Sequence, residues 1–297
     1  MFDRLTVRPI TIGTSGLGKR EGADAALADA IVASPLAQID TSNAYAGGRS
    51  EQLLGGAIAR AGGLEPGLSL FTKVDQDPVT GRFDGDRVRR SVDESITRLG
   101  VDRFPVLHLH DPYTITVAEA MAPGGAVEAL VRLREEGVID AVGIAAGPRG
   151  LVEDYVRTDA FDAVLTHNRY TLVDRTAETV LTLATERGMA VFNAAPFGGG
   201  ILAGSSHRGA TYGYRPASPE LLAYIDRLGE VCSHWQVPVP AVALQFSLAE
   251  PRIHSTVVGV STTERLTGLA ELAATTVPAG LWDALSGLGT PPASPTD

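Results

Sequence analysis

The chain has 297 residues, 44% of them hydrophobic, so it can bury a large core and is not expected to be disordered. Its formal net charge of −10 argues against a nucleic-acid partner, because such a partner requires clustered positive charge. Cys232 is the single cysteine, which excludes an internal disulfide or a multi-cysteine metal site and fits a cytoplasmic protein. No apolar stretch reaches the roughly 18 residues of a membrane-spanning helix, so no membrane association is expected.

Short apolar runs alternate with longer amphipathic segments along the whole chain. The expected strands are Ile10–Thr14, Leu36–Asp40, Leu68–Lys73, Val106–His110, Ala141–Ala145, Ala163–His167, Ala190–Asn193 and Thr256–Val258. The expected helices are Ala23–Ala33, Ser50–Ala61, Asp86–Leu99, Ala126–Glu136, Leu151–Arg157, Asp174–Arg187 and two more between Pro219 and Ala249. This alternation, with no break in composition, predicts a single-domain α/β fold over residues 1–297, the (β/α)8 TIM barrel, with a frayed tail from about residue 290. A doubly wound sheet is the alternative.

Four residues in the first 110 positions are candidates for a proton-transfer centre. Asp40, Lys73 and His110 each end an expected strand, and Tyr45 follows in the loop after the second strand. The carboxyl ends of barrel strands open on one face, where barrel enzymes carry out chemistry. A free phenol titrates near ~10, and a lysine ammonium at ~4 Å favours the phenolate by about 4 kcal/mol at an effective dielectric of 20. A carboxylate beside that lysine keeps it charged.

Two other segments are considered for function, one rich in glycine and one containing serine and histidine. The segment Gly13–Gly18 reads G-x-x-G-x-G, whereas the dinucleotide fingerprint of a Rossmann fold is G-x-G-x-x-G. The segment Ser205–His207 contains serine and histidine but no G-x-S-x-G nucleophile elbow, so triad hydrolysis is not expected.

A zinc site of the kind found in barrel hydrolases is another alternative. His108 and His110 lie on the same side of a strand, because side chains alternate, and His167 ends another strand. A zinc barrel needs more ligands than these, so no metal is expected. His108 is expected to lie in the interior, one layer below His110.

The segment that contains Asp40 and Tyr45 resembles a known family signature. Asp40–Gly55 reads D-T-S-N-A-Y-A-G-G-R-S-E-Q-L-L-G, which resembles the D-T-x-x-x-Y-G-x-S-E-x-x-L-G signature of the aldo-keto reductases. The segments Ser91–Asp102, Phe197–Gly204 and Val258–Arg265 resemble further parts of that family, and the resemblance runs from about Ile10 to Leu288.

One subgroup is more similar than the rest. The segments that carry this similarity are Leu109–Pro112, Asn168–Asp174, Asn193–Ala203 and Ala243–Leu248. They resemble the aldose 1-dehydrogenases that act on D-threo-aldoses, L-fucose or galactose, with pyridoxal dehydrogenases close by. The resemblance implies a small-molecule sugar or carbonyl substrate, oxidation of a C1 hemiacetal to a lactone, and NAD or NADP as cofactor.

The resemblance also implies a role for each of the four residues. Tyr45 is expected to be the general acid/base, with Lys73 lowering its pKa and Asp40 holding Lys73. His110 is expected to hydrogen-bond the reacting oxygen and orient the substrate. The chain's task is then positioning plus one proton transfer.

Cofactor contacts are expected from the later strands. His167 or Asn168 falls where the family holds the nicotinamide carboxamide. The loop Phe197–Gly200, with Gly198 and Gly199, is expected to follow the pyrophosphate, because glycines let backbone N–H groups approach phosphate. Gly259, Ser261 and Arg265 fall in the adenosine-phosphate segment.

Several cofactor positions depart from the family pattern. Ala145 and Ala146 replace the usual Ser-Asn, Ala194 replaces the aromatic that stacks on nicotinamide, and Gly259 replaces a basic residue. Gly268 and Leu269 replace the polar partners of adenine. A weaker grip on the dinucleotide is therefore expected, with the preference between NAD and NADP open.

Two other functions stay open at this stage. One is a carbonyl reductase of the same family working on aldehydes or ketones. The other is a non-catalytic barrel that binds the cofactor. The sequence leaves the exact substrate, the physiological direction and the oligomeric state undetermined.

Overall fold

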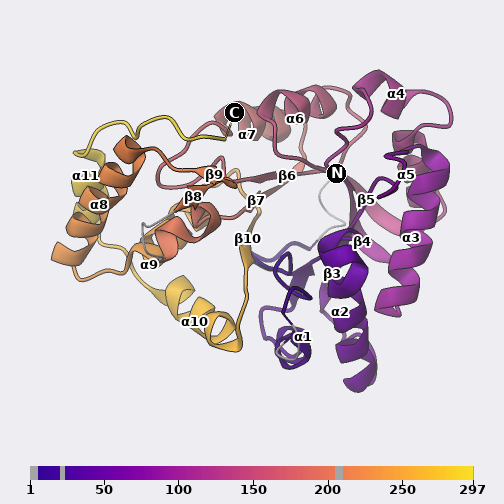
Figure 1. The fold of residues 1–297 in the computed structure, drawn as a ribbon, viewed down its shortest axis with the longest axis horizontal. Coiled ribbons are helices and arrows are strands. Elements are labelled where there is room, and N and C mark those ends of the chain that lie inside the picture. The colour runs from indigo at the N-terminus through magenta and orange to yellow at the C-terminus, as the bar shows by residue number, and fades with distance from the viewer. Residues whose placement is uncertain (1–5, 21–23, 205–209, 297) are drawn as a thin grey trace.

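Strands at the eight expected places hydrogen-bond in parallel in the order β1-β10-β7-β6-β5-β4-β3-β2 and close into a barrel (Figure 1). The computed structural model describes residues 6–20, 24–204 and 210–296. The barrel strands are β1 (Ile10–Gly13), β2 (Gln38–Asp40), β3 (Ser69–Val74), β4 (Phe104–His110), β5 (Ile139–Ala145), β6 (Ala163–His167), β7 (Ala190–Ala194) and β10 (Ser255–Gly259). The predicted (β/α)8 barrel is confirmed, and a doubly wound open sheet is excluded because the strands close on themselves.

Helices follow the strands and cover the outside of the barrel (Figure 1). They are α1 (Asp24–Val32), α2 (Arg49–Arg60), α3 (Gly85–Leu99), α4 (Val117–Met121), α5 (Ala126–Glu135), α6 (Arg149–Val156), α7 (Glu178–Glu186), α8 (Pro219–His234), α9 (Val239–Leu248), α10 (Thr263–Ala274) and α11 (Ala279–Ser286). Short 3-10 turns, η2 (Tyr45–Gly48) and η3 (Gly198–Ala203), follow β2 and β7. Each expected helix forms, while α4, α10 and α11 are additional.

One expected helix begins later than the sequence pattern indicates. The apolar spacing predicts a start at Asp174, but α7 begins at Glu178. Thr171 and Asp174 form a bridge with each other, and the Asp174 carboxylate accepts hydrogen bonds from the backbone and side chain of Thr176. These local bonds hold residues 171–176 in a turn, since an aspartate that bonds nearby backbone N–H groups competes with helix formation.

The inside of the barrel is a packed apolar layer. Its two large side chains, Phe71 and Phe192, meet edge to face with ring centroids 5.5 Å apart. Small residues surround them, including Ala141, Ala163 and Ala190. A larger apolar cluster fills the space between the strands and the outer helices. The barrel is therefore closed below this layer, and space for a ligand lies above it at the carboxyl ends of the strands.

The carboxyl ends of the strands bring distant residues to one face. Gly13 pairs in register with Asp40 on one side and with Gly259 on the other. Lys73 pairs with His108, and His167 pairs with Ala194. The candidate residues that end different strands therefore lie around one rim.

The C-terminal tail differs from the expected frayed segment. The side chains of Ser294 and Thr296 both hydrogen-bond the carboxylate of Asp174, and the Thr296 carbonyl accepts from Arg169. A proline-rich segment is already extended, and these contacts hold its end against the barrel rim.

Within the described ranges, none of the helices is long and apolar enough to cross a membrane. The segment Ser205–His207, considered above for triad chemistry, lies entirely in the range 205–209 outside the described residues.

Candidate active site

Lys73 is the centre of the first cluster of polar groups. It lies in β3 and is only 1% exposed. Its Nζ donates to Asp40 Oδ2 at 2.6 Å, to the carbonyl of Thr41 at 2.6 Å and to the hydroxyl oxygen of Tyr45 at 3.0 Å. An ammonium has three hydrogens, and each has an acceptor here. Burial lowers the pKa of Lys73, but the charges and hydrogen bonds of Asp40 and Tyr45 together outweigh it, and the net pKa is raised. This lysine is therefore a fixed cation.

Tyr45 differs from expectation in its pKa. Burial favours the neutral phenol more strongly than Lys73 favours the phenolate, and the pKa of Tyr45 is raised to about 12. The charges of Asp40 and Asp75 act in the same direction as burial. The expected lowering by Lys73 is present but is outweighed. Because Lys73 donates to the tyrosine oxygen, the Tyr45 proton is free to point away from Lys73.

His110 is held by a residue that the sequence analysis did not single out. Its Nδ1 lies 2.6 Å from Oδ1 of Asp75, and its Nε2 lies 3.7 Å from Oδ2 of Asp111. The Tyr45 and His110 rings meet edge to face with centroids 5.8 Å apart. Asp75 follows β3 directly, two residues after Lys73, so chain alternation places both side chains on the same side. The structure thus brings Asp40, Tyr45, Lys73 and His110 together as expected, and adds Asp75.

A pocket of about 400 Å3 opens at this rim. Its lining side chains include all four predicted residues, together with Asp111, Tyr113, His167 and Tyr214. Tyr113 and Tyr214 are exposed aromatics at the mouth, and the Tyr113 hydroxyl donates to Asp111 at 2.7 Å. Asp111, Tyr113 and Tyr214 were missed because they lie in loops beyond the apolar runs. The pocket offers polar groups at the floor and aromatic faces at the entrance.

His108 lies below the pocket, as expected, in the interior of the barrel. It is fully buried and its ring meets Phe192 edge to face at 5.7 Å. Burial lowers its pKa well below the ordinary value, so the ring is neutral. Gly143 makes room for it, because a Cβ there would lie 2.1 Å from the His108 ring. Across the described part of the chain, no group of three or more histidine, cysteine, aspartate or glutamate side chains is arranged to hold a metal ion.

The structure separates the two candidates for the nicotinamide carboxamide. His167 lines the pocket, whereas Asn168 is 2% exposed and its amide nitrogen lies 3.1 Å from Nδ1 of His167. Asn168 has a left-handed backbone, with φ of 59°, which turns its side chain away from the strand direction. Burial lowers the pKa of His167 to about 4, partly opposed by Asp111, so its ring is neutral at pH 7.

The glycine loop after β7 has two different surfaces. Gly198 is buried under the ring of Tyr212, and a Cβ on it would lie 2.4 Å from that ring. Gly199 is exposed, with φ of 77°, and Phe197 is half-buried beside it. Tyr212 belongs to the hairpin of β8 (Thr211–Tyr212) and β9 (Arg215–Pro216). Gly198 thus has a packing role, while Gly199 presents backbone to solvent.

The third cofactor segment lies at the start of α10. Gly259 is exposed and lines the pocket. Thr262 caps the helix by accepting from the Arg265 backbone at 3.2 Å, and the Arg265 guanidinium donates to Ser261 at 3.2 Å. Arg265 is exposed. Gly13, Ala194 and Gly259 line the pocket with backbone or small side chains, and Gly259 ends the strand that leads into this segment.

Comparisons with known proteins agree with this geometry. The model of the aldo/keto reductase family matches residues 9–288. A D-threo-aldose 1-dehydrogenase of a Pseudomonas species is 37% identical over 206 residues, which cover 69% of this chain and 62% of that relative, so the match spans less than two thirds of its length. A pyridoxal 4-dehydrogenase of Microbacterium luteolum is 30% identical over 302 residues, covering 88% of each chain.

The fold has a solved counterpart. An aldo-keto reductase from Bacillus halodurans, determined in its holo form, superposes with a TM-score of 0.80 at 22% identity, covering 98% of this chain and 95% of that one.

Fold and site together define a barrel oxidoreductase with a buried Asp–Lys pair behind a tyrosine. The chain belongs to the aldo/keto reductase family. Members of this family use NAD(P)H, so the enzyme is an NAD(P)-dependent oxidoreductase.

Proposed function

We propose that this enzyme oxidises the C1 hemiacetal of an aldose, of the L-fucose, D-arabinose or galactose type, to the lactone. The observation that carries the proposal is the Tyr45 hydroxyl, which lies 3.0 Å from the buried Lys73 ammonium in a pocket that also holds His110. The likeness to D-threo-aldose 1-dehydrogenase supports the substrate class. Carboxylate and aromatic groups at the mouth suit a sugar, whose ring has hydroxyls on its edge and apolar C–H groups on its face.

Tyr45 exchanges a proton with the reacting oxygen in this mechanism. When an alcohol is oxidised, its O–H proton passes to the Tyr45 oxygen, and Lys73 stabilises the phenolate that must form first. In the reverse direction neutral Tyr45 donates its proton to the carbonyl oxygen. His110 is the second hydrogen-bond partner of that oxygen, and Asp40 keeps Lys73 charged and in place.

A bound nicotinamide supplies the hydride chemistry. His167 would hold its carboxamide, with Asn168 behind His167. The loop Phe197–Gly200 would bind the pyrophosphate through Gly199, and Ser261 and Arg265 would bind the adenosine end. Only Arg265 offers positive charge among the three expected residues there, so we propose that NAD and NADP are both accepted.

The deciding experiment is a substrate screen with both oxidised cofactors. Purified enzyme is mixed with L-fucose, D-arabinose, D-galactose and pyridoxal, and formation of NAD(P)H is followed by absorbance. An aldose should give turnover that Tyr45→Phe abolishes. If no sugar and no pyridoxal is oxidised and neither cofactor binds, the proposal fails.

The second candidate is a pyridoxal or other carbonyl enzyme of the same family. The likeness to pyridoxal 4-dehydrogenase, which covers 88% of the chain, favours it specifically. Steady-state rates in both directions separate the candidates. Faster reduction of aldehydes than oxidation of any sugar would favour the carbonyl enzyme, and tight cofactor binding without turnover would favour the non-catalytic barrel.

A further inference from the structure

The Asp75 carboxylate lies behind His110, on the side away from the pocket. Its Oδ1 lies 2.6 Å from His110 Nδ1. Its Oδ2 accepts from the Ser42 hydroxyl at 2.6 Å and from the Ala44 backbone N–H at 2.9 Å. An oxygen that accepts two donors has no proton of its own. Burial raises the pKa of Asp75, but His110 and these donors outweigh it and the net pKa is lowered.

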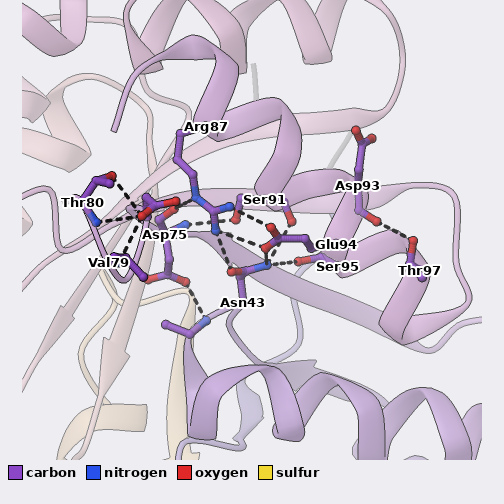
Figure 2. Close-up of polar contacts among 12 residues, drawn as sticks. Asn43, Asp75, Val79, Thr80, Arg87, Ser91, Asp93, Glu94, Ser95 and Thr97 are labelled. Carbon is purple, nitrogen blue, oxygen red and sulfur yellow. Dashed lines mark hydrogen bonds and ion pairs between the residues drawn. The ribbon is translucent and has the colours of Figure 1, made fainter. Parts of the chain in front are cut away.

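A buried network holds Asp75 in this place (Figure 2). Its backbone N–H donates to Ser91, and its carbonyl accepts from Nε of Arg87 at 2.9 Å. Arg87 is 4% exposed and also donates to Asn43 and Glu94. Asn43 is the residue between Ser42 and Ala44, so α3 fixes both the Asp75 backbone and the segment that donates to its carboxylate. A carboxylate on a fixed backbone, with two donors on one oxygen, can orient its partner without reorganisation.

The carboxylate determines which nitrogen of His110 carries a proton. Since Asp75 Oδ1 can only accept, Nδ1 must be protonated and must donate. Nε2 then faces the pocket, where Asp111 Oδ2 lies 3.7 Å away. Each ring nitrogen thus has a carboxylate oxygen on its side, which can only accept a hydrogen bond.

We propose that Asp75 is a positioning residue that holds His110 as an imidazolium, with Nδ1–H directed to Asp75 and Nε2–H donating to the reacting oxygen. This inference rests on the proposed function, in which Tyr45 exchanges the substrate proton. An oxygen that becomes a carbonyl keeps no hydrogen of its own, so it needs donors from the protein. The imidazolium supplies one of them through the whole reaction, and Asp75 balances its charge.

Other charged groups also face His110, and each enters the balance. Lys73, from β3, opposes the positive charge. His108 and His167 also face His110, but burial lowers the pKa of each, so both rings are neutral and add no charge. Asp111, next to His110, favours the positive charge. Tyr45 packs on the ring, and a phenolate there favours the imidazolium too. Two groups contact Nδ1 directly, the Asp75 carboxylate at 2.6 Å and the Ser42 hydroxyl oxygen at 3.2 Å. Of these two the carboxylate carries the charge, which gives Asp75 the largest share.

The substitution Asp75→Asn removes the negative charge of residue 75 while keeping the shape of its side chain. In the variant, the atom that replaces Oδ2 must still accept hydrogen bonds, because the Ala44 N–H and the Ser42 hydroxyl donate to it. The amide oxygen therefore takes that place, and the amide NH2 faces Nδ1 of His110. The ring then has to accept at Nδ1, and the neutral form carries its proton on Nε2. The variant keeps a donor toward the pocket but loses the positive charge.

The test is nitrogen NMR of full-length enzyme labelled with 15N-histidine, with the His110 signals assigned by their loss in His110→Gln. In wild type at pH 7 we expect both nitrogens of His110 to be protonated. In Asp75→Asn we expect a bare Nδ1 and a proton on Nε2. The control Asp77→Asn keeps the turn bonds to Val79 and Thr80 and should match wild type. A bare Nδ1 in wild type, or a protonated Nδ1 in Asp75→Asn, would overturn the proposal.

Kinetics give the second readout. Asp75→Asn should lower kcat about 10- to 100-fold, with cofactor affinity unchanged. Unchanged kcat would contradict the proposal. The nitrogen signals need no substrate, and their assignment requires only that His110→Gln folds. Failure of the proposed function, seen as no turnover by wild type, is therefore distinguishable from failure of the role given to Asp75.

Discussion

The Nζ of Lys73 lies 3.0 Å from the hydroxyl oxygen of Tyr45, and the same ammonium lies 2.6 Å from Asp40. This arrangement gives the tyrosine a stable cation on one side and the pocket on the other. Burial nevertheless keeps Tyr45 neutral, with its pKa raised to about 12. Tyr45 therefore carries its proton in the resting site. Before Tyr45 can accept the proton of a substrate hydroxyl, it must first lose its own.

The variant Tyr45→Phe tests the proton-transfer role. It removes one oxygen and keeps the ring that contacts His110. Because general acid–base catalysis contributes about 100- to 10,000-fold, turnover should fall by at least about 100-fold while cofactor affinity stays the same. Initial rates by NAD(P)H absorbance and a fluorescence titration of the cofactor measure the two effects. Near-normal activity in the variant would exclude Tyr45 from this role.

The variant Lys73→Met tests the buried ion pair. Removing one partner leaves the Asp40 carboxylate buried without its cation, which should reduce the free energy of unfolding by about 3–5 kcal/mol. Urea unfolding measures the change, with Lys19→Met, at an exposed site, as control. The double variant with Asp40→Asn should lose less than the sum of the two single variants. Simple additivity would show that the two groups do not interact energetically.

Most of the site residues were predicted from the positions at which apolar runs end. Asp40, Lys73 and His110 each close a run, and the barrel brings such ends together whatever the details of packing. The position of His108 in the interior followed from the same alternation. These predictions depend on strand periodicity alone, which is a local property.

Features that depend on packing between distant segments were not predicted. Asp75 lies just past an apolar run, and its contact with His110 joins the ends of β3 and β4. The pKa of Tyr45 was expected to fall, because a sequence shows the neighbouring lysine but not the burial that outweighs it. The C-terminal tail looked frayed because its two anchors to Asp174 join residues about 120 apart.

The variant Gly143→Ala tests the space below the pocket. A Cβ there would lie 2.1 Å from the ring of His108, which Phe192 confines on another side. Overpacking of this kind costs about 1–3 kcal/mol, so the free energy of unfolding should fall by that amount. Replacing His108 by serine in the same chain should recover part of it. Gly150→Ala, which meets no atom within 4 Å, is the control and should be neutral or slightly stabilising. An equal effect of both substitutions would exclude the contact with His108 as the cause.

The last prediction concerns stability in acid. Burial lowers the pKa of His167 from 6.5 to about 4, so the folded chain binds this proton less readily than the unfolded chain does. Between about pH 6.5 and pH 4 the unfolded state binds more protons, and the free energy of unfolding must therefore fall as the pH falls. His167 lies at the pocket wall and is partly screened by solvent, so its share at pH 5 should be about 1–2 kcal/mol.

Urea unfolding at pH 7.5 and pH 5 measures this loss in wild type and in His167→Gln. Glutamine keeps a polar side chain but does not titrate, so the variant should lose less stability on acidification than wild type. His234→Gln, at an exposed site near the end of α8, is the matched control and should behave as wild type. His108 titrates in the same direction and is present in all three proteins, so its contribution cancels from the comparison. Equal losses in wild type and His167→Gln would mean that His167 is not held neutral by burial in the pocket wall.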